Sequence, residues 1–440
     1  MRKTQAFGVS LLLSLAAAGQ TAFGQQEVVI KLGEGVPAIA VAIPKFIVPA
    51  QSPSASSVAD EMQQVLQDDL KYSRVFEPLP KSYYNYIRPL NSDQVFFKDW
   101  DSIQAKVLLA GAISQAPGKD ELIFEGRLFD VRSERLIVGK RYQFGRDLAR
   151  YTAHKMADEI MKAYGEKPVF TTKIVFVSNR DGNDELYMMD FDGQNQTRLT
   201  FNKVTDYMPA WSADGNAIAF TSYRNFTAGL YLLYPYEQDA GKPRIRPVST
   251  RGTSNSPSFS PDGKRLAFCS SMEGNANSEV YVTSSDGQER PRNITNNEAI
   301  DTAPTWSPTS REIAFISDRG GSPQVYVMDA EGANVRRISF GGSHFDSPAW
   351  SPIGDRLVYV SRVDNVFDLF LHNLRKNEVS KLTESNARNE SPCWSPDGRH
   401  IVFSSNRSGT IQLYTVDYDG ANFRALTSKG QNKLPDWSNK

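Results

Sequence analysis

Hydrophobic and polar positions follow one recurring pattern in the second half of the chain. In one copy, residues 392–395 (Pro-Cys-Trp-Ser) lead into a Pro-Asp-Gly turn, and the apolar run 401–403 follows. Proline sets φ in such turns and glycine accepts positive φ. A polar loop leads to 412–414 (Gln-Leu-Tyr), and an Asp-Gly turn at 419–420 leads to a last segment at 425–427. The pattern predicts a small sheet of four strands joined by tight turns.

The opening signal of this unit, Pro-x-aromatic-Ser, occurs six times. Its aromatic residues lie 48, 47, 44, 44 and 43 residues apart, at Trp211, Phe259, Trp306, Trp350, Trp394 and Trp437. Self-similarity at this period with four strands per unit predicts a β-propeller. The unit at 174–180 has no such signal before it, and the signal at 435–438 has no sheet after it. If the C-terminal strand completes the N-terminal blade, six blades close into a ring without exposed edges.

Residues 25–165 show a different pattern, in which strands and helices are mixed. Apolar, β-branched runs predict strands at 38–48, 107–113, 122–130 and 137–144. Ser57 and Asp60 have capping-box spacing and predict the start of a helix, and 148–164 has an apolar helical face. The predicted fold class is therefore multidomain: an N-terminal α/β domain (25–165), a linker (166–172) and a C-terminal six-bladed β-propeller (173–440) closed by the C-terminal strand.

Residues 1–24 have the composition of a secretory signal peptide. Arg2 and Lys3 are positive, 7–18 are apolar, and small residues precede Gln25. The apolar run is too short for a transmembrane anchor, and no later run is long enough to span a bilayer. We therefore expect an exported, periplasmic mature chain with no membrane span.

The charge balance bears on the class of partner, and the cysteine positions bear on whether a disulfide forms. Lys+Arg and Asp+Glu are both 50, so the formal net charge is zero, and no run of like charges stands out. This argues against nucleic acid as a partner. The only two cysteines, Cys269 and Cys393, fall in blades on opposite sides of the predicted ring, so we expect two buried free thiols rather than a disulfide.

The motifs of several enzyme classes are missing. The sequence has no Gly-x-Ser-x-Gly, His-Glu-x-x-His, Cys-x-x-Cys or Walker motif. Its four histidines are scattered without metal-ligand spacing, and His154 is expected to be a structural hydrogen-bonding residue. Asp-x-Asp-Gly at 190–193 and 417–420 resembles part of a calcium loop, but a hairpin turn explains it better because the downstream Glu is missing. We expect no catalytic residue, no metal and no cofactor.

Propellers act through the face of the ring and its central channel. The residues just before each Pro-x-aromatic-Ser signal should cross to the innermost strand of the next blade and rim the channel on one face. They mix aromatic, apolar, acidic and amide side chains, which suits protein binding. We predict a partner-binding rim with these candidate residues: Tyr207, Met208, Asn255, Ser256, Asp301, Thr302, Phe345, Asp346, Glu390 and Lys433.

A second class of function stays open. An exported propeller enzyme, such as a hydrolase, would need carboxylates that converge in the channel. Candidates for this role are Asp206, Asp301, Asp346 and Glu390. Paired carboxylates in a deep pocket would favour the enzyme, whereas a wide rim with exposed aromatic residues would favour binding.

Taken together, these features resemble the TolB family of periplasmic proteins of the Tol–Pal system. The resemblance rests on the signal peptide, on the α/β domain with Asp69, Phe76 and His154, on the repeats, and on the terminal Pro-Asp-Trp-Ser. The chain departs from the family pattern at 212–214, at 352–354, at Phe259 in place of Trp, and at Thr253, where a family histidine is expected.

The resemblance implies a non-enzymatic scaffold that binds other envelope proteins. It implies that the propeller face binds the peptidoglycan-associated lipoprotein Pal, with Asn255, Ser256, Asp301 and Thr302 at positions that match the Pal-contacting loops. It also implies that the N-terminal segment and domain engage TolA, through Gln25, Gln26, Glu27, Val28, Val29 and Ile30. The implied role is to support outer-membrane integrity and constriction at cell division, and we expect the chain to act as a monomer.

Overall fold

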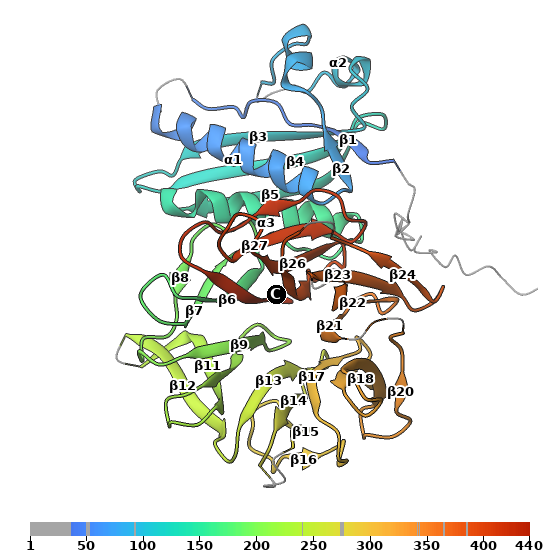
Figure 1. The fold of residues 1–440 in the computed structure, drawn as a ribbon. Coiled ribbons are helices and arrows are strands. Elements are labelled where there is room, and N and C mark those ends of the chain that lie inside the picture. Colours follow the sequence, from blue (N-terminus) through green and yellow to red (C-terminus); the bar gives the residue numbers. More distant parts are fainter. Residues whose placement is uncertain are drawn as a thin grey trace, which may run out of the picture.

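The computed structural model describes residues 37–49, 53–91, 94–239, 241–272, 277–340, 342, 344–363, 366–383 and 386–440. The predicted signal peptide and the segment 25–30 lie outside the described residues. An N-terminal domain built on a five-stranded sheet stacks on a ring of six four-stranded sheets (Figure 1). This arrangement confirms the predicted fold class, an α/β domain followed by a six-bladed propeller.

The N-terminal sheet has the strand order β2-β1-β3-β4-β5. Its strands are β1 (Ile39–Ala42), β2 (Phe76–Pro78), β3 (Val107–Gln115), β4 (Leu122–Asp130) and β5 (Arg135–Phe144). β1 pairs in parallel with β2 and β3, and β3, β4 and β5 pair antiparallel. Successive residues of a strand face opposite sides, so Val107 and Leu109 join the main core while Leu108 joins a smaller cluster around Trp100.

Two long helices cover the main-core face of this sheet. They are α1 (Pro53–Tyr72) and α3 (Ala149–Ala163), which pack against each other. The short elements are η1 (Lys81–Tyr86), α2 (Phe97–Ser102) and η2 (Arg146–Leu148). The predicted helix start at Ser57 was wrong, because α1 already begins at Pro53. Proline suits the first helical position, since its φ is preset and its missing N–H has no partner there.

Each propeller sheet is antiparallel, and in five of the six sheets the four strands follow in chain order from the channel outward. The first three blades contain β6 (Lys173–Ser178), β7 (Glu185–Asp190), β8 (Thr197–Arg198); β9 (Asp206–Trp211), β10 (Ile218–Ser222), β11 (Gly229–Asp239), β12 (Lys242–Ser249); and β13 (Ser254–Phe259), β14 (Arg265–Ser270), β15 (Glu279–Ser284), β16 (Arg292–Asn293). The last three contain β17 (Asp301–Trp306), β18 (Glu312–Ser317), β19 (Gln324–Asp329), β20 (Arg336–Arg337); β21 (Phe345–Trp350), β22 (Arg356–Val363), β23 (Val366–Asn373), β24 (Glu378–Lys381); and β25 (Asn389–Trp394), β26 (His400–Ser405), β27 (Gln412–Asp417), β28 (Arg424–Ala425).

The C-terminal strand closes the ring. β29 (Asn432–Trp437) pairs with β6 of the first blade, in a register that runs from Asn432 opposite Ser178 to Trp437 opposite Ile174. The first blade therefore takes its innermost strand from the end of the chain and its other strands from the start of the propeller. The predicted closure is confirmed.

A bulge interrupts the innermost strand of every blade just before its proline. The pairing register shifts there in all six blades. The residue at the bulge is never glycine, yet its φ lies between +47 and +53°: Met208, Ser256, Ala303, Ser347, Ser391 and Leu434. The residues predicted to form a crossover thus belong to the strand itself. A bulge changes the direction in which the neighbouring side chains point. It therefore determines which side chains of the inner strand line the channel.

The N-terminal domain covers the propeller face that carries the Pro-Asp-Gly turns. Tyr72 of α1 stacks on His400 with ring centroids 3.9 Å apart, and Arg74 donates to Asp417 over 3.0 Å. Arg399 donates to Glu166 of the linker over 2.7 Å. Hydrophobic residues of α1, α3 and the first and last blades form one continuous core. The inner strands begin at the opposite face of the ring.

The two cysteines are free thiols in the structure. Cys269 is fully buried, and burial raises the pKa of its thiol to about 12. Cys393 is half-buried rather than buried as predicted, because it lies on an inner strand that lines the channel, and its Sγ lies 3.3 Å from an oxygen of Asp436.

Candidate functional site

The central channel consists of two chambers. The outer chamber, on the face away from the N-terminal domain, has a volume of about 520 Å³, and we call it the mouth. The inner chamber, of about 530 Å³, is lined by Lys167 of the linker and by the C-terminal Asn439 and Lys440. Both chambers are bordered by the six prolines of the repeat: Pro209, Pro257, Pro304, Pro348, Pro392 and Pro435.

Six of the ten predicted rim residues line the mouth. They are Met208, Asn255, Ser256, Thr302, Asp346 and Glu390. Tyr207 and Lys433 line a neighbouring groove of about 340 Å³ instead, together with Glu390. This groove and the mouth share Glu390, Ser391 and Leu434 as lining residues, so they form one continuous surface.

The structure places the other two predicted residues inside the blades. Asp301 is completely buried and Phe345 is 3% exposed. Both are the first residue of an innermost strand, before the bulge. Phe345 packs against Ile316 and Val325 of the neighbouring fourth blade as well as against Tyr359 of its own. Asp301 accepts hydrogen bonds from Arg319 over 3.0 Å and from Asn297 over 2.6 Å.

An arginine in the loop between the second and third strands explains the burial of Asp301. Arg319 lies over the rings of Phe315 and Tyr326 and donates to Ser317 Oγ as well as to Asp301. The same arrangement recurs at Arg180, Arg224 and Arg407. The sequence signal for it is Ser-x-Arg after the second strand, which identifies the partner of the first inner-strand residue.

The mouth combines small, apolar and acidic side chains. Ser256, Ala303 and Ser347 contribute small side chains to its lining. Met208 and Leu434 are half-buried apolar residues of the same lining. Asp346 is exposed, and Glu390 accepts from Arg388 over 2.7 Å. A wide opening with apolar anchors and a few charges suits the surface of another protein.

Two of the four carboxylates considered for an enzyme, Asp206 and Asp301, do not line the mouth. Asp206 and Asp301 are buried next to Arg224 and Arg319. Burial raises the pKa of Asp206, against the hydrogen bonds from Ser222 and Asn202. Of the four candidates, Asp346 and Glu390 line the mouth.

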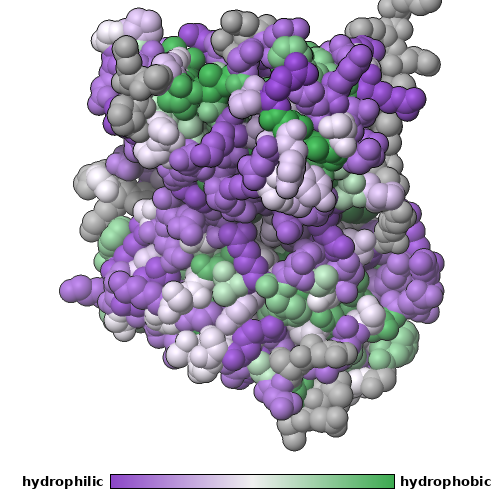
Figure 2. Space-filling model, turned by 90° about the horizontal axis from the view of Figure 1, so that it is seen from above, coloured by the Kyte–Doolittle hydropathy of each residue, from purple (hydrophilic) through white to green (hydrophobic). Residues whose placement is uncertain are grey.

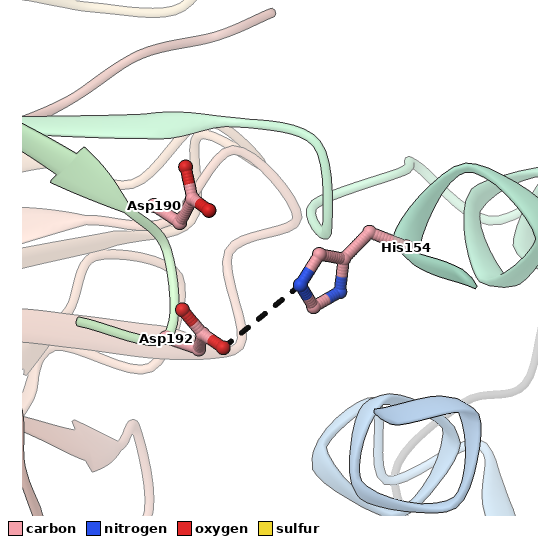
Figure 3. A group of neighbouring side chains, drawn as sticks. All are labelled: His154, Asp190 and Asp192. Carbon is pink, nitrogen blue, oxygen red and sulfur yellow. Dashed lines mark ion pairs between the residues drawn. The ribbon is translucent and has the colours of Figure 1, made fainter. Parts of the chain in front are cut away.

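A second polar cluster lies between the two domains, and sequence reasoning missed it as a unit. His154 of α3 faces Asp190 and Asp192 of the first blade, with ligand-type atoms all within 4.8 Å of one another (Figure 3). Asp190 accepts hydrogen bonds from Lys173 and Asn195, and Asp192 accepts one from Arg150. These donors occupy the oxygens that a metal ion would need, so the cluster is better described as an ion-pair seam. Glycine at 193 has φ +92°, as expected of the predicted hairpin turn.

His154 is the centre of this seam. Its Nδ1 lies 2.7 Å from Asp69 Oδ2 of α1, and its Nε2 lies 3.9 Å from Asp192 Oδ2. Burial opposes a charge on His154, but the hydrogen bond to Asp69 and the charges of Asp69 and Asp192 outweigh it and raise its pKa above 6.5. Burial likewise raises the pKa of Asp69 to about 6. The predicted structural role of His154 is therefore that of a link between the two domains.

The face of the molecule seen from the side of the N-terminal domain is largely hydrophilic, with separate hydrophobic patches (Figure 2). Exposed apolar residues of this domain include Tyr83, Tyr86, Leu136 and Ile137. Among the described residues, no helix combines the length and the apolar character that a membrane crossing requires.

The fold and the site define a two-domain β-propeller protein whose central channel opens on the face away from the N-terminal domain. Family models match both parts of the chain: the TolB amino-terminal domain over 28–137 and the TolB beta propeller domain over 161–440. The chain belongs to the TolB family.

Known relatives agree with this assignment. A protein TolB homolog of Chlorobium luteolum is 30% identical over 298 residues, which cover 67% of this chain and 65% of the relative. A Tol-Pal system protein TolB of Desulfosudis oleivorans is 32% identical over 292 residues, covering 65% and 64%. The matches thus span slightly under two thirds of each relative. The crystal structure of TolB from Acinetobacter baumannii superposes with a TM-score of 0.75 at 25% identity, over 91% of this chain and 96% of that one. The Desulfosudis oleivorans relative is named as a protein of the Tol–Pal system.

Proposed function

We propose that the chain is a periplasmic protein-binding component of the Tol–Pal system, and that it holds Pal at the channel mouth. The observation that carries this proposal is the mouth itself, a wide cavity with half-buried apolar residues and few charges on the free face of the ring. Its size and mixed lining suit the side chains of a folded partner. Asp301 and Phe345 contribute indirectly, by fixing the inner strands that carry the contact residues.

The second part of the proposal concerns the N-terminus. We propose that residues 25–30 and the N-terminal domain engage TolA, so that the chain supports outer-membrane integrity and constriction at division. The support is the membership of the TolB family and the placement of this domain on the face opposite the mouth. A chain with partners at opposite ends can bridge them without competition for one surface.

A binding role accounts for the channel better than a hydrolase does. A glycosidase-type site needs two carboxylates at a set separation around a substrate. Here Asp206 and Asp301 are paired with arginines inside their blades, and Glu390 is paired with Arg388 at the surface. We therefore propose that the chain has no catalytic residue in the channel.

Two threonines of β17 provide a matched test. Thr302 lines the mouth and Thr305 lines the inner chamber, and both are half-buried. Thr302→Arg should weaken the binding of Pal, purified without its lipid anchor, by at least about tenfold because a large charged side chain then fills the opening. Thr305→Arg should leave the affinity near that of the unchanged protein. Calorimetric titration measures both, and equal affinities for all three proteins would refute the mouth as the Pal site.

A further inference from the structure

One turn of the second blade departs from a pattern that three other blades share. In three blades the turn after the second strand runs from Asn179 to Gly182, from Asp318 to Gly321 and from Asn406 to Gly409. In the second blade the same turn runs from Tyr223 to Phe226. In all four, the N–H of the fourth residue donates to the carbonyl of the first, over 2.7 to 3.0 Å. The four turns are therefore structurally equivalent.

In the three other blades, the side chain at the first position of the turn ties the turn to a nearby backbone segment by a hydrogen bond. Asn179, Asp318 and Asn406 each accept a hydrogen bond from a backbone N–H of the strand-to-strand crossover, each over 2.8 Å. A tyrosine ring cannot accept this bond. Tyr223 is instead 42% exposed and stacks on Tyr207, with ring centroids 5.9 Å apart.

The fourth position normally requires glycine. Gly182, Gly321 and Gly409 have φ of +110, +92 and +91°. Phe226 has φ +66°, a region that is unfavourable for a residue with a Cβ. Its side chain is 98% exposed, so no packing in the described structure offsets this strain.

The second blade thus gives up two stabilising features of one turn, and each loss places an aromatic side chain on the free face of the ring. A single exposed apolar residue needs no explanation. Here, two aromatic residues occupy positions where three other blades carry Asn or Asp and Gly. These two residues do need an explanation, since strained residues that persist often mark binding sites.

The aromatic turn adjoins the mouth through the groove. Tyr207 and Tyr223 form one side of the groove, and Glu390 and Lys433 lie among its other lining residues. The charges of the groove are already paired: Lys433 with Asp184 over 2.9 Å, and Glu390 with Arg388 over 2.7 Å. The groove therefore offers an occupant apolar rings and satisfied charges, which suits an uncharged segment better than a charged one.

We propose that Tyr223 and Phe226 are a second contact point for the partner that occupies the mouth. An extended segment of that partner follows the groove outward and packs an apolar side chain against the two rings. Because aromatic side chains supply large contact areas at low entropic cost, such residues often dominate an interface. This inference rests on the proposed function, since it assigns a further part of the same partner to the same face.

Giving the turn of the second blade the residues found in the three other blades tests the proposed aromatic contact without weakening the fold. The double variant Tyr223→Asn, Phe226→Gly regains the side-chain hydrogen bond and the glycine, so its Tm should equal or exceed that of the unchanged protein. Its affinity for Pal without the lipid anchor should fall by about tenfold or more. Tyr86→Asn, which removes another exposed tyrosine from the N-terminal domain, is the matched control and should bind normally.

The outcomes separate the two proposals. If the double variant binds Pal like the unchanged protein while Thr302→Arg does not, the aromatic contact is refuted and the mouth stands. If neither change affects binding, the proposed function fails and this inference fails with it. A double variant with a clearly lower Tm would contradict the equivalence of the four turns and overturn the inference.

Discussion

At the scale of single residues, the arginine of the Ser-x-Arg signal links the end of a blade's second strand to the first residue of its innermost strand, which lines the channel. Arg319 bonds Ser317 and Asp301 and lies against two aromatic rings. Asp301 is completely buried, and an unpaired buried carboxylate is costly. The arginine thereby allows an acidic residue at the start of the inner strand, directly beside Thr302 of the mouth.

Replacing this arginine should destabilise the protein. We expect Arg319→Met to lower the free energy of unfolding by about 1–3 kcal/mol, because Asp301 keeps Asn297 as a donor but loses its cation. Arg336→Met is the control, since Arg336 pairs with Glu312 at the surface, and it should cost less than about 1 kcal/mol. Denaturant unfolding measures both. Equal losses of unfolding free energy in the two variants would show that the buried Arg319–Asp301 pair contributes no more to stability than a surface ion pair.

At the scale of elements, the sequence predicted what is local and repeated. The blade strands are specified by short continuous apolar runs. Their turns are specified by Pro-Asp-Gly and Asp-x-x-Gly, whose backbone preferences act within a few residues. The closure by β29 was predicted because its signal lacks a following sheet. Six of the ten rim residues were placed at the mouth by their position in the repeat.

Features that depend on partners far along the chain were not predictable in this way. The bulge at Met208 and its equivalents uses positive φ without glycine, so no residue type announces it. The burial of Asp301 depends on an arginine 18 residues later. The seam around His154 brings together α1, α3 and the first blade, and no local motif links them.

The seam predicts a pH dependence of stability. The pKa of His154 is raised in the folded protein, so charged His154 stabilises the fold below pH 6.5, and this contribution is lost as the pH rises through the folded-state pKa. The raised pKa of Asp69, about 6, also lowers stability as the pH rises, but in the separate window between 3.8 and about 6. The free energy of unfolding should therefore fall as the pH rises above 6.5.

A histidine variant isolates this contribution. His154→Gln should be less stable than the unchanged protein at pH 6, and the difference should shrink by pH 8.5. His344→Gln, a half-buried histidine of the propeller, serves as the control and should leave the pH profile unaltered. Denaturant titrations at a series of pH values give the profiles. A difference between His154→Gln and the unchanged protein that is constant over this range would contradict the account.

At the scale of the whole molecule, the two faces of the ring differ in availability. One face is joined to the N-terminal domain by Tyr72, Arg74 and the His154 seam. The other face presents the mouth, the groove and the aromatic turn as one surface. Under the proposed function, the free face holds the partner of the propeller and the opposite end of the molecule meets the partner of the N-terminal domain.

Site-specific photo-crosslinking tests the central claim, that Pal binds at the mouth. A crosslinking side chain replaces Asp346, which is exposed in the mouth, or Asn439, which is exposed in the inner chamber. We expect a covalent adduct with Pal from position 346 and none from position 439. An adduct from position 439 alone, or Pal binding that persists without an adduct from position 346, would contradict the account.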